Sequence, residues 1–143
     1  MKTVIFDIDG VLCDNKDYKD WFDKDGNFQN EVFAENIPLF DSLEWGKALL
    51  EGVEDQYNIV ISSARNETYV AKTKQWLEDQ SIEYDELYLR PSGTHKVQHK
   101  LNVASKYDVL FIVEDEPTLV GAYRQNGYTV LQPNNVYGGN NGV

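Results

Sequence analysis

The stretch Val4-Ile5-Phe6-Asp7-Ile8-Asp9-Gly10-Val11 decides the fold. Its apolar, partly β-branched start predicts a buried strand, and Gly10 ends that strand. Asp7 and Asp9 follow at the carboxyl end, where open α/β sheets bind their ligands, and they would share one face if the strand continued. Two carboxylates this close need a cation or a shared proton. By itself the stretch is also compatible with an acidic turn after an edge strand. Features elsewhere in the chain are needed to distinguish that turn from an active site.

Four more apolar runs have the composition of buried strands, at residues 58–61, 86–89, 109–113 and 128–131. Between them the apolar spacing predicts helices over 38–50, 67–78, 95–105 and 117–124. This alternation predicts an α/β domain in which helices cover both faces of a parallel sheet.

The composition sets limits on the class of protein. The 143 residues suit one domain, and a hydrophobic content of 41% is typical of a globular chain. The lone Cys13 allows no intrachain disulfide, and no apolar run predicts a signal peptide or a membrane span, so we expect a cytoplasmic protein. The net charge of −11 repels polyanions at long range and favours a small substrate over nucleic acid.

Two segments fall outside the strand–helix alternation. Residues 10–37 form a polar excursion that includes the aromatic group Tyr18, Trp21, Phe22 and Phe28. These rings could stack on a substrate base or sugar, or pack the excursion against the body of the domain. Residues 133–143 are rich in Gly and Asn, and we expect a loosely ordered tail there.

Polar side chains also follow three later segments. Ser62-Ser63-Ala64-Arg65 ends the second strand just before the predicted helix over 67–78, and Ser63, or alternatively Ser62, could bind a phosphate oxygen or cap that helix. Lys96 and Lys100 lie around another helix start and could neutralise a phosphate or face solvent. Glu114-Asp115-Glu116 ends the fourth strand and could complete an oxygen-rich Mg²⁺ site.

Three other features suggest chemistry but favour ordinary structural roles. Residues 23–27 lack the Gly and Glu of a calcium loop and predict a turn at a hairpin tip. His95 and His99 have a helical spacing but no further ligand, which favours two surface histidines. No base accompanies Cys13 in the sequence, which favours a packed thiol.

Taken in order, Asp7-Ile8-Asp9-Gly10-Val11, Ser63-Ala64-Arg65, Lys100 and Glu114-Asp115 resemble the four motifs of the haloacid dehalogenase superfamily. The resemblance implies that Asp7 is a nucleophile that forms an aspartyl phosphate and that Asp9 is the general acid and base. It also implies that Asp7, the backbone carbonyl of Asp9, and Asp115 hold Mg²⁺. Ser63, Ala64, Arg65 and Lys100 would bind the substrate phosphate.

Together with 74–77 and Leu89-Arg90-Pro91, these motifs are similar to the phosphatase half of polynucleotide kinase–phosphatase enzymes, which remove 3′-phosphates from nucleic-acid ends. Two features differ from that family. The chain has no P-loop, so no kinase activity is implied. Ala64 replaces a common glycine. The spacing favours Lys100 over Lys96 as the phosphate-binding lysine.

We therefore expect a single haloacid dehalogenase-like domain over 1–143, a three-layer sandwich with sheet order 3-2-1-4-5 and a minimal cap in 10–37. The expected reaction is Mg²⁺-dependent hydrolysis of a phosphomonoester. The substrate would be a nucleotide or a nucleic-acid 3′ end, with a small metabolite phosphate as the alternative. A catalytically silent binding module is a third possibility, but such a module would not need the Asp7/Asp9 pair.

Overall fold

The computed structural model describes residues 1–134 and contains a five-stranded sheet in the order β3-β2-β1-β4-β5. The strands are β1 (Thr3–Phe6), β2 (Asn58–Asn66), β3 (Glu86–Arg90), β4 (Val109–Val113) and β5 (Val130–Leu131). All four neighbouring pairs are parallel. Both the fold class and the strand order predicted from the sequence are confirmed.

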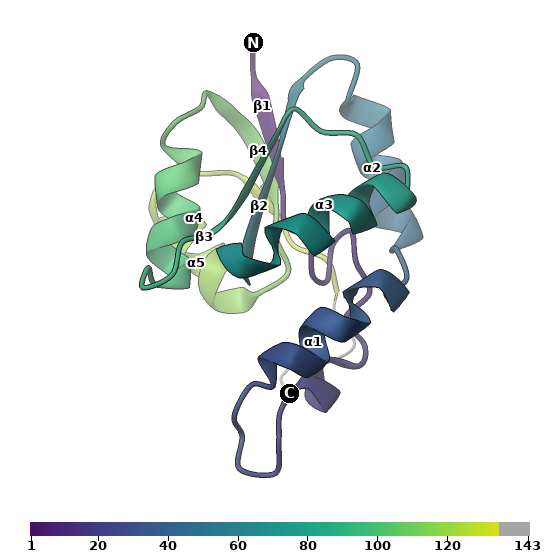
Figure 1. Ribbon diagram of the computed structural model, residues 1–143. Helices are drawn as coiled ribbons and strands as arrows, with labels where there is room; N and C mark the ends of the chain where they lie inside the picture. Colours follow the sequence, from purple (N-terminus) through teal and green to yellow (C-terminus); the bar gives the residue numbers. More distant parts are fainter. Residues whose placement is uncertain (135–143) are drawn as a thin grey trace.

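A flap projects beyond the carboxyl ends of the strands (Figure 1). It consists of the 3-10 helix η1 (Tyr18–Trp21), a hairpin closed by a Phe22–Phe28 bridge, the helix α1 (Asn30–Asn36) and the 3-10 helix η2 (Ile37–Leu39). The turn predicted at 23–27 is confirmed at the hairpin tip, where Asp23 Oδ1 accepts from the backbone N–H groups of Asp25 and Asn27. The predicted tail over 133–143 lies, from residue 135 on, outside the described residues.

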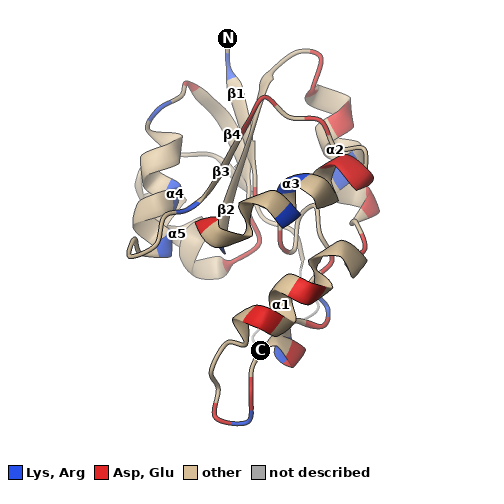
Figure 2. Ribbon diagram, in the orientation of Figure 1, with Lys and Arg blue, Asp and Glu red and all other residues tan. Residues whose placement is uncertain are grey.

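Charge is distributed unevenly over these elements (Figure 2). Residues 14–36 of the flap carry seven carboxylates and three lysines, a net charge of −4. Residues 90–100, which include the end of β3 and the start of α4 (Lys96–Ala104), carry three basic side chains and no carboxylate. Although the chain as a whole is acidic, one segment at the carboxyl end of the sheet is therefore cationic.

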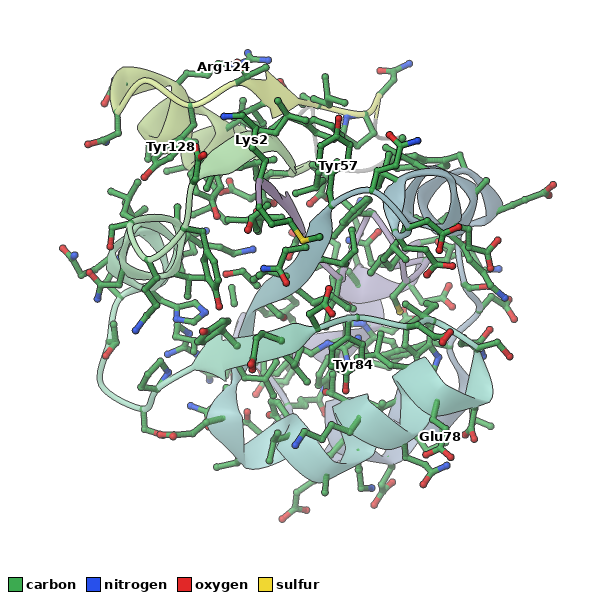
Figure 3. The ribbon with its side chains drawn as sticks, turned by 90° about the horizontal axis from the view of Figure 1, so that it is seen from above. Lys2, Tyr57, Glu78, Tyr84, Arg124 and Tyr128 are labelled. Atoms are coloured by element: carbon green, nitrogen blue, oxygen red, sulfur yellow. The ribbon has the colours of Figure 1, made fainter. Side chains whose placement is uncertain are left out.

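Helices cover both faces of the sheet, as predicted (Figure 3). Side chains alternate along β1, so Val4 and Phe6 pack beneath α2 (Glu44–Val53) and α3 (Val70–Asp79) in one core. Ile5 points to the other face and packs with Val103 of α4 and Val120 of α5 (Pro117–Gln125). The result is a three-layer sandwich with a separate hydrophobic core on each side of the sheet.

Two predicted boundaries are wrong. A continuous helix over 38–50 does not form, because η2 ends at Leu39, the chain is extended through Leu43, and α2 begins only at Glu44. The Leu43 N–H donates to the carbonyl of Leu12 at 2.8 Å, which holds this segment against the loop after β1. The strand predicted over 58–61 is also too short, because β2 continues in an extended conformation to Asn66.

The flap is tied to the body by α3 and by the turn before it. The Trp76 indole N–H donates to the carbonyl of Phe40, and Lys72 donates to the carbonyl of Ala34. Tyr69, in the 3-10 helix η3 (Glu67–Tyr69), hydrogen-bonds the side chain of Asn30. Within residues 1–134, no helix has the length and apolar composition that crossing a membrane requires.

Candidate active site

Three carboxylates meet at the carboxyl ends of β1 and β4. Asp7 follows β1, and Glu114 and Asp115 follow β4; all three are buried, and each has an oxygen within 4.8 Å of the others. The strand pairing brings them together, because Phe6 lies opposite Val113 in the register and the Asp7 N–H donates to the Val113 carbonyl at 3.0 Å. Three carboxylate oxygens in one buried place are the donor set that a hard divalent cation prefers.

Lys100 reaches into this cluster from α4. Its ammonium lies 2.9 Å from Asp7 Oδ1, 2.9 Å from Glu114 Oε1 and 2.5 Å from the carbonyl of Ser62, and its side chain is 2% exposed. Lys96, one turn earlier, is half-exposed and pairs with Glu116 at 3.6 Å. Of the two lysines considered from the sequence, the structure brings Lys100 to Asp7.

The cluster carries more negative than positive charge, and its pKa values reflect this. Burial and the neighbouring Asp7 raise the pKa of Glu114 to about 8 and that of Asp115 to about 10. For Asp7, burial acts to raise the pKa, but the Lys100 charge and the hydrogen bonds from Lys100, Glu114 and Asp115 together hold the pKa below its ordinary value. One ammonium does not balance three buried carboxylates, so the side chains present fit a bound divalent cation.

Close backbone packing holds the loop after β1. Gly10 has φ +87°, and a Cβ at this position would lie 2.0 Å from Asp115 Oδ2, so glycine is required both by conformation and by space. On the other side of the loop, a Cβ at Gly46 of α2 would lie 1.8 Å from the carbonyl oxygen of Val11. The motif glycine is evident from the sequence, whereas nothing in the sequence singles out Gly46.

The carboxylate of Asp9 is bound to Arg65 and is not a member of the acidic cluster. Arg65 Nε lies 3.0 Å from Asp9 Oδ2 and Nη2 lies 2.8 Å from Oδ1, a two-point contact. The Arg65 side chain is 2% exposed and that of Asp9 is 32% exposed. Asp9 therefore lies at the border between the buried cluster and solvent.

Arg65 is itself held on three sides. Its Nη1 donates to Thr73 Oγ1 of α3 at 3.1 Å, and its guanidinium carbon lies 5.2 Å from the ring centre of Phe33 and 5.9 Å from that of Phe40. Burial acts to lower the pKa of Arg65, but Asp9 raises it overall. The guanidinium thus connects Asp9 with α3 and with two aromatic rings of the flap.

Ser63 and Ala64 lie in the last part of β2, beside the cluster. Ser63 is buried, and its Oγ accepts a hydrogen bond from the Arg65 N–H at 3.0 Å. It is not a helix cap as one alternative had it, since Asn66 caps η3 by accepting from the Thr68 N–H. The carbonyl of Ala64 accepts from Arg90 Nε at 3.0 Å.

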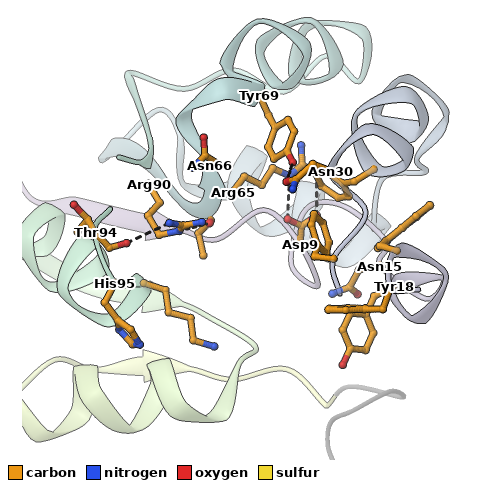
Figure 4. Close-up of a pocket in the computed structure, with 16 residues that line it drawn as sticks. Asp9, Asn15, Tyr18, Asn30, Arg65, Asn66, Tyr69, Arg90, Thr94 and His95 are labelled. Carbon is orange, nitrogen blue, oxygen red and sulfur yellow. Dashed lines mark hydrogen bonds and ion pairs between the residues drawn. The ribbon is translucent and has the colours of Figure 1, made fainter. Parts of the chain in front are cut away.

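A cavity of about 610 Å³ opens beside Asp9 (Figure 4). Asn15 and Tyr18 of the flap line one side, Arg90, Thr94 and His95 line the other, and Asp9 and Arg65 lie between them. The structure divides the aromatic residues of the flap between the two roles considered for them. All four rings line the cavity, but Trp21 is 9% exposed and packs against Phe33 and Phe40, whereas Tyr18, Phe22 and Phe28 are 37–39% exposed.

Two of the remaining sequence interpretations can also be compared with the structure. The prediction of two surface histidines is wrong for His99, which is 4% exposed because α4 turns this face toward the sheet. Burial and, less strongly, Lys100 lower the pKa of His99 to about 4. Cys13 is fully buried, as expected for a packed thiol, and burial raises its pKa.

Several residues of the site were not assigned a role from the sequence. Glu114 was noted only as part of an acidic run, yet it pairs with Lys100 and accepts from the backbone N–H groups of Asp115 and Glu116. Its position next to Asp115 could have indicated this. Thr73 contacts Arg65 from eight residues along the chain, whereas Phe33 and Phe40 contact it from the segment before α2, and no local pattern marks any of the three.

Comparison with known proteins agrees with this geometry. The family model of the polynucleotide kinase PNKP phosphatase domain, a haloacid dehalogenase family, matches residues 1–137. A search of curated proteins finds no match. Among solved structures, a chain described as "Structure of Pnkp1/Rnl/Hen1 complex" is similar with a TM-score of 0.77 and 22% identity over 93% of this chain. The match covers 46% of that longer chain, so this protein spans less than half of its length.

Two further structures share the fold. A class C acid phosphatase from Bacillus anthracis with tungstate bound has a TM-score of 0.67 and 16% identity, over 95% of this chain and 68% of that one. A haloacid dehalogenase-like hydrolase from Streptococcus pneumoniae has a TM-score of 0.66 and 15% identity, over 92% and 84%.

The fold and the family match define a phosphatase of the haloacid dehalogenase type. Within that class, the chain belongs to the family of polynucleotide kinase PNKP phosphatase domains.

Proposed function

We propose that this protein hydrolyses a phosphomonoester through a covalent phosphate on Asp7. The observation that carries the proposal is the position of Asp7, whose carboxylate is buried, contacts Lys100 and lies beside Glu114 and Asp115. Despite burial, Lys100 and the hydrogen bonds of the cluster hold the pKa of Asp7 below its ordinary value. An ionised carboxylate in a fixed position can attack phosphorus without first losing a proton.

The proposed reaction has two steps. In the first, an oxygen of Asp7 forms a bond to phosphorus while the bond to the leaving oxygen breaks, and Asp9 gives a proton to that oxygen. In the second, Asp9 takes a proton from a water molecule while the water oxygen attacks the phosphorus. The bond between phosphorus and Asp7 breaks, which regenerates the Asp7 carboxylate and releases inorganic phosphate. Asp9 suits this exchange because its carboxylate is held by Arg65 at the edge of the cavity.

The remaining residues would bind charge. A Mg²⁺ ion held by Asp7, Asp115 and the backbone carbonyl of Asp9 would stabilise negative charge on the phosphoryl oxygens. Lys100 supplies a second positive charge at Asp7. Ser63 accepts from the Arg65 N–H and can donate its own hydroxyl proton to a phosphoryl oxygen. Ala64 and Arg65 would line the phosphate site, Arg65 chiefly through its hold on Asp9.

The substrate we propose is a nucleotide or a nucleic-acid 3′-phosphate. Membership of a family named for polynucleotide kinase supports it, as does a cavity that combines aromatic rings with basic side chains. A small metabolite phosphate is the second candidate, and the net charge of −11 favours it because that charge repels a long polyanion.

Asp7→Asn tests the proposal. Hydrolysis of an aryl phosphate in Mg²⁺ should fall to the uncatalysed rate, while Asp108→Asn, an exposed aspartate far along the chain, should behave as wild type. Acid quenching during turnover of a ³²P-labelled substrate should trap a hydroxylamine-sensitive phosphate on wild type and none on Asp7→Asn. Full activity in Asp7→Asn would disprove the covalent role, and full activity after chelation of divalent ions would disprove the metal requirement.

A further inference from the structure

A polar layer, formed by Ser62, Asp7 and Glu114, lies at the carboxyl end of the core between the sheet and the helices α4 and α5 (Figure 1). Three neighbouring strands contribute apolar residues to this core at one level of the register, namely Val60, Ile5 and Ile112. Because side chains alternate along a strand, the residues of the polar layer, two positions further on, point to the same helices. Lys100 reaches the layer from α4, and Tyr123 of α5 packs in the core beside it.

The ammonium group of Lys100 has no donor left for a substrate. It has three N–H groups, and the three acceptors around it are Asp7 Oδ1 at 2.9 Å, Glu114 Oε1 at 2.9 Å and the carbonyl of Ser62 at 2.5 Å. To bind a phosphoryl group on Asp7, Lys100 has to turn at least one N–H away from these acceptors. The acceptor that it leaves is buried, and it loses free energy unless another donor replaces the lysine.

Two buried hydroxyl groups beside Lys100 have protons to donate. Ser62 is 0% exposed and Tyr123 is 1% exposed, and neither hydroxyl has a hydrogen-bond partner within residues 1–134. Burial is the main cause that raises the pKa of Tyr123, although Lys100 opposes the rise, so the phenol keeps its proton. Ser62 and Glu114 also act on this pKa, which indicates that both lie near the phenol. A buried hydroxyl without a partner lowers the stability of the free protein, so its presence needs another reason.

We propose, on the basis of the phosphatase function above, that Tyr123 is a positioning residue that acts through Glu114 and Lys100. When a phosphoryl group occupies the site, Lys100 turns one N–H from Glu114 toward it. The Tyr123 hydroxyl then donates to Glu114 Oε1 in place of the lysine, and the Ser62 hydroxyl donates to the Tyr123 oxygen. Only hydrogen bonds change partners in this exchange. Because the new bonds form in the transition state and not in the free protein, they raise kcat.

Tyr123→Phe tests the inference because it removes only the hydroxyl. Urea unfolding in the presence of a chelator should show a variant at least as stable as wild type, since a buried hydroxyl without a partner is lost. With 4-nitrophenyl phosphate and Mg²⁺, kcat should fall about 10- to 100-fold, the size expected for one hydrogen bond to a charged group, while KM changes little. The inhibition constant of orthovanadate, which resembles five-coordinate phosphorus, should rise by a similar factor.

Two further variants serve as control and cross-check. Tyr128→Phe is the matched control, because Tyr128 packs against the same core and its ring lies edge-on to Tyr123 at 6.0 Å, and its kcat should match wild type. Ser62→Ala should lower kcat by a smaller factor than Tyr123→Phe. The double variant should lose less than the product of the two separate factors, since the two hydroxyls act in one chain of hydrogen bonds.

The outcomes separate this inference from the function on which it rests. If Tyr123→Phe keeps the kcat and the orthovanadate inhibition of wild type, the positioning role is wrong and the phosphatase stands. If Tyr123→Phe is less stable than wild type in the chelator, its hydroxyl is already bonded in the free protein, and the inference is wrong whatever happens to kcat. A change confined to KM would also contradict it. If wild type hydrolyses no aryl phosphate in Mg²⁺, the proposed function fails and this inference fails with it.

Discussion

The strand ends and the flap approach the same cavity but are built in different ways. At the strand ends, the acidic cluster directly follows two strands, Lys100 reaches it from α4, and these buried groups hold one another through several short contacts. In the flap, the helices are short, and the rings of Tyr18, Phe22 and Phe28 are partly open to solvent. The buried charges suit chemistry that requires fixed geometry, whereas partly open rings suit contact with a substrate that enters and leaves.

Arg65 is where the two regions meet. It lies in β2 and binds Asp9, and its guanidinium packs over the rings of Phe33 and Phe40. Four substitutions test this difference between the buried strand ends and the flap, beginning with the largest expected effect.

Lys100→Gln should be the most damaging change at the strand ends. It removes the only cation in contact with Asp7 and Glu114 among residues 1–134 and leaves buried carboxylates unpaired, a loss of about 3–5 kcal/mol in the free energy of unfolding. Urea unfolding with a chelator present measures it, with the exposed Lys74→Gln as control. A variant as stable as wild type would mean that the cluster does not depend on this ammonium.

Arg65→Lys keeps the charge but loses the two-point contact with Asp9. On the proposed mechanism, kcat/KM for an alkyl phosphate should fall about 100-fold, because its poor leaving group needs a well-placed proton donor. The loss for 4-nitrophenyl phosphate should be smaller, since that leaving group needs less protonation. Equal losses on both substrates would show that Arg65 does not act through the acid step.

His99 makes stability depend on pH. Its pKa is about 4 when folded and about 6.5 when unfolded, so the unfolded chain binds more protons between these values and stability is lost as pH falls from 6.5 to 4. The loss should be roughly 3 kcal/mol and should be absent from His99→Asn. Unfolding measured at both pH values, with the exposed His95→Asn as control, checks the difference. Parallel curves for wild type and His99→Asn would refute it.

Phe33→Leu should have the smallest effect, because it changes packing at the boundary between the regions. It removes the ring over Arg65 and the contact with Tyr69, and we expect a loss of about 1–2 kcal/mol in the free energy of unfolding. Phe22→Leu, a ring of the flap that does not contact Arg65, should cost less. If the two variants are equally stable, the flap does not contribute to holding Arg65.

Local sequence patterns were sufficient to predict the features of this protein that depend only on residues close together in the chain. The strand that delivers Asp7, the glycine that follows it and the strand–helix alternation all follow from short-range periodicity, and the predicted sheet order is confirmed. The helix over 38–50 failed because a backbone contact from Leu43 to Leu12, 31 residues away, overrides local helical preference. The predicted end of the second strand was wrong for a similar reason, since the pairing of Asn66 with Arg90 of β3 extends β2 to Asn66.

The fold class, the sheet order and the residue types at the strand ends could therefore all be predicted before the structure was known. The spacing already favoured Lys100 over Lys96, but which side chains touch became visible only in the folded domain: Arg65 binds Asp9, and Glu114 shares Lys100 with Asp7. The physical reason is the separation along the chain over which each kind of interaction acts. Strand periodicity and turns are local properties of the chain. A buried ion pair needs two groups, here separated by 14 to 93 residues, to leave water together, and only the packed domain brings them to one place.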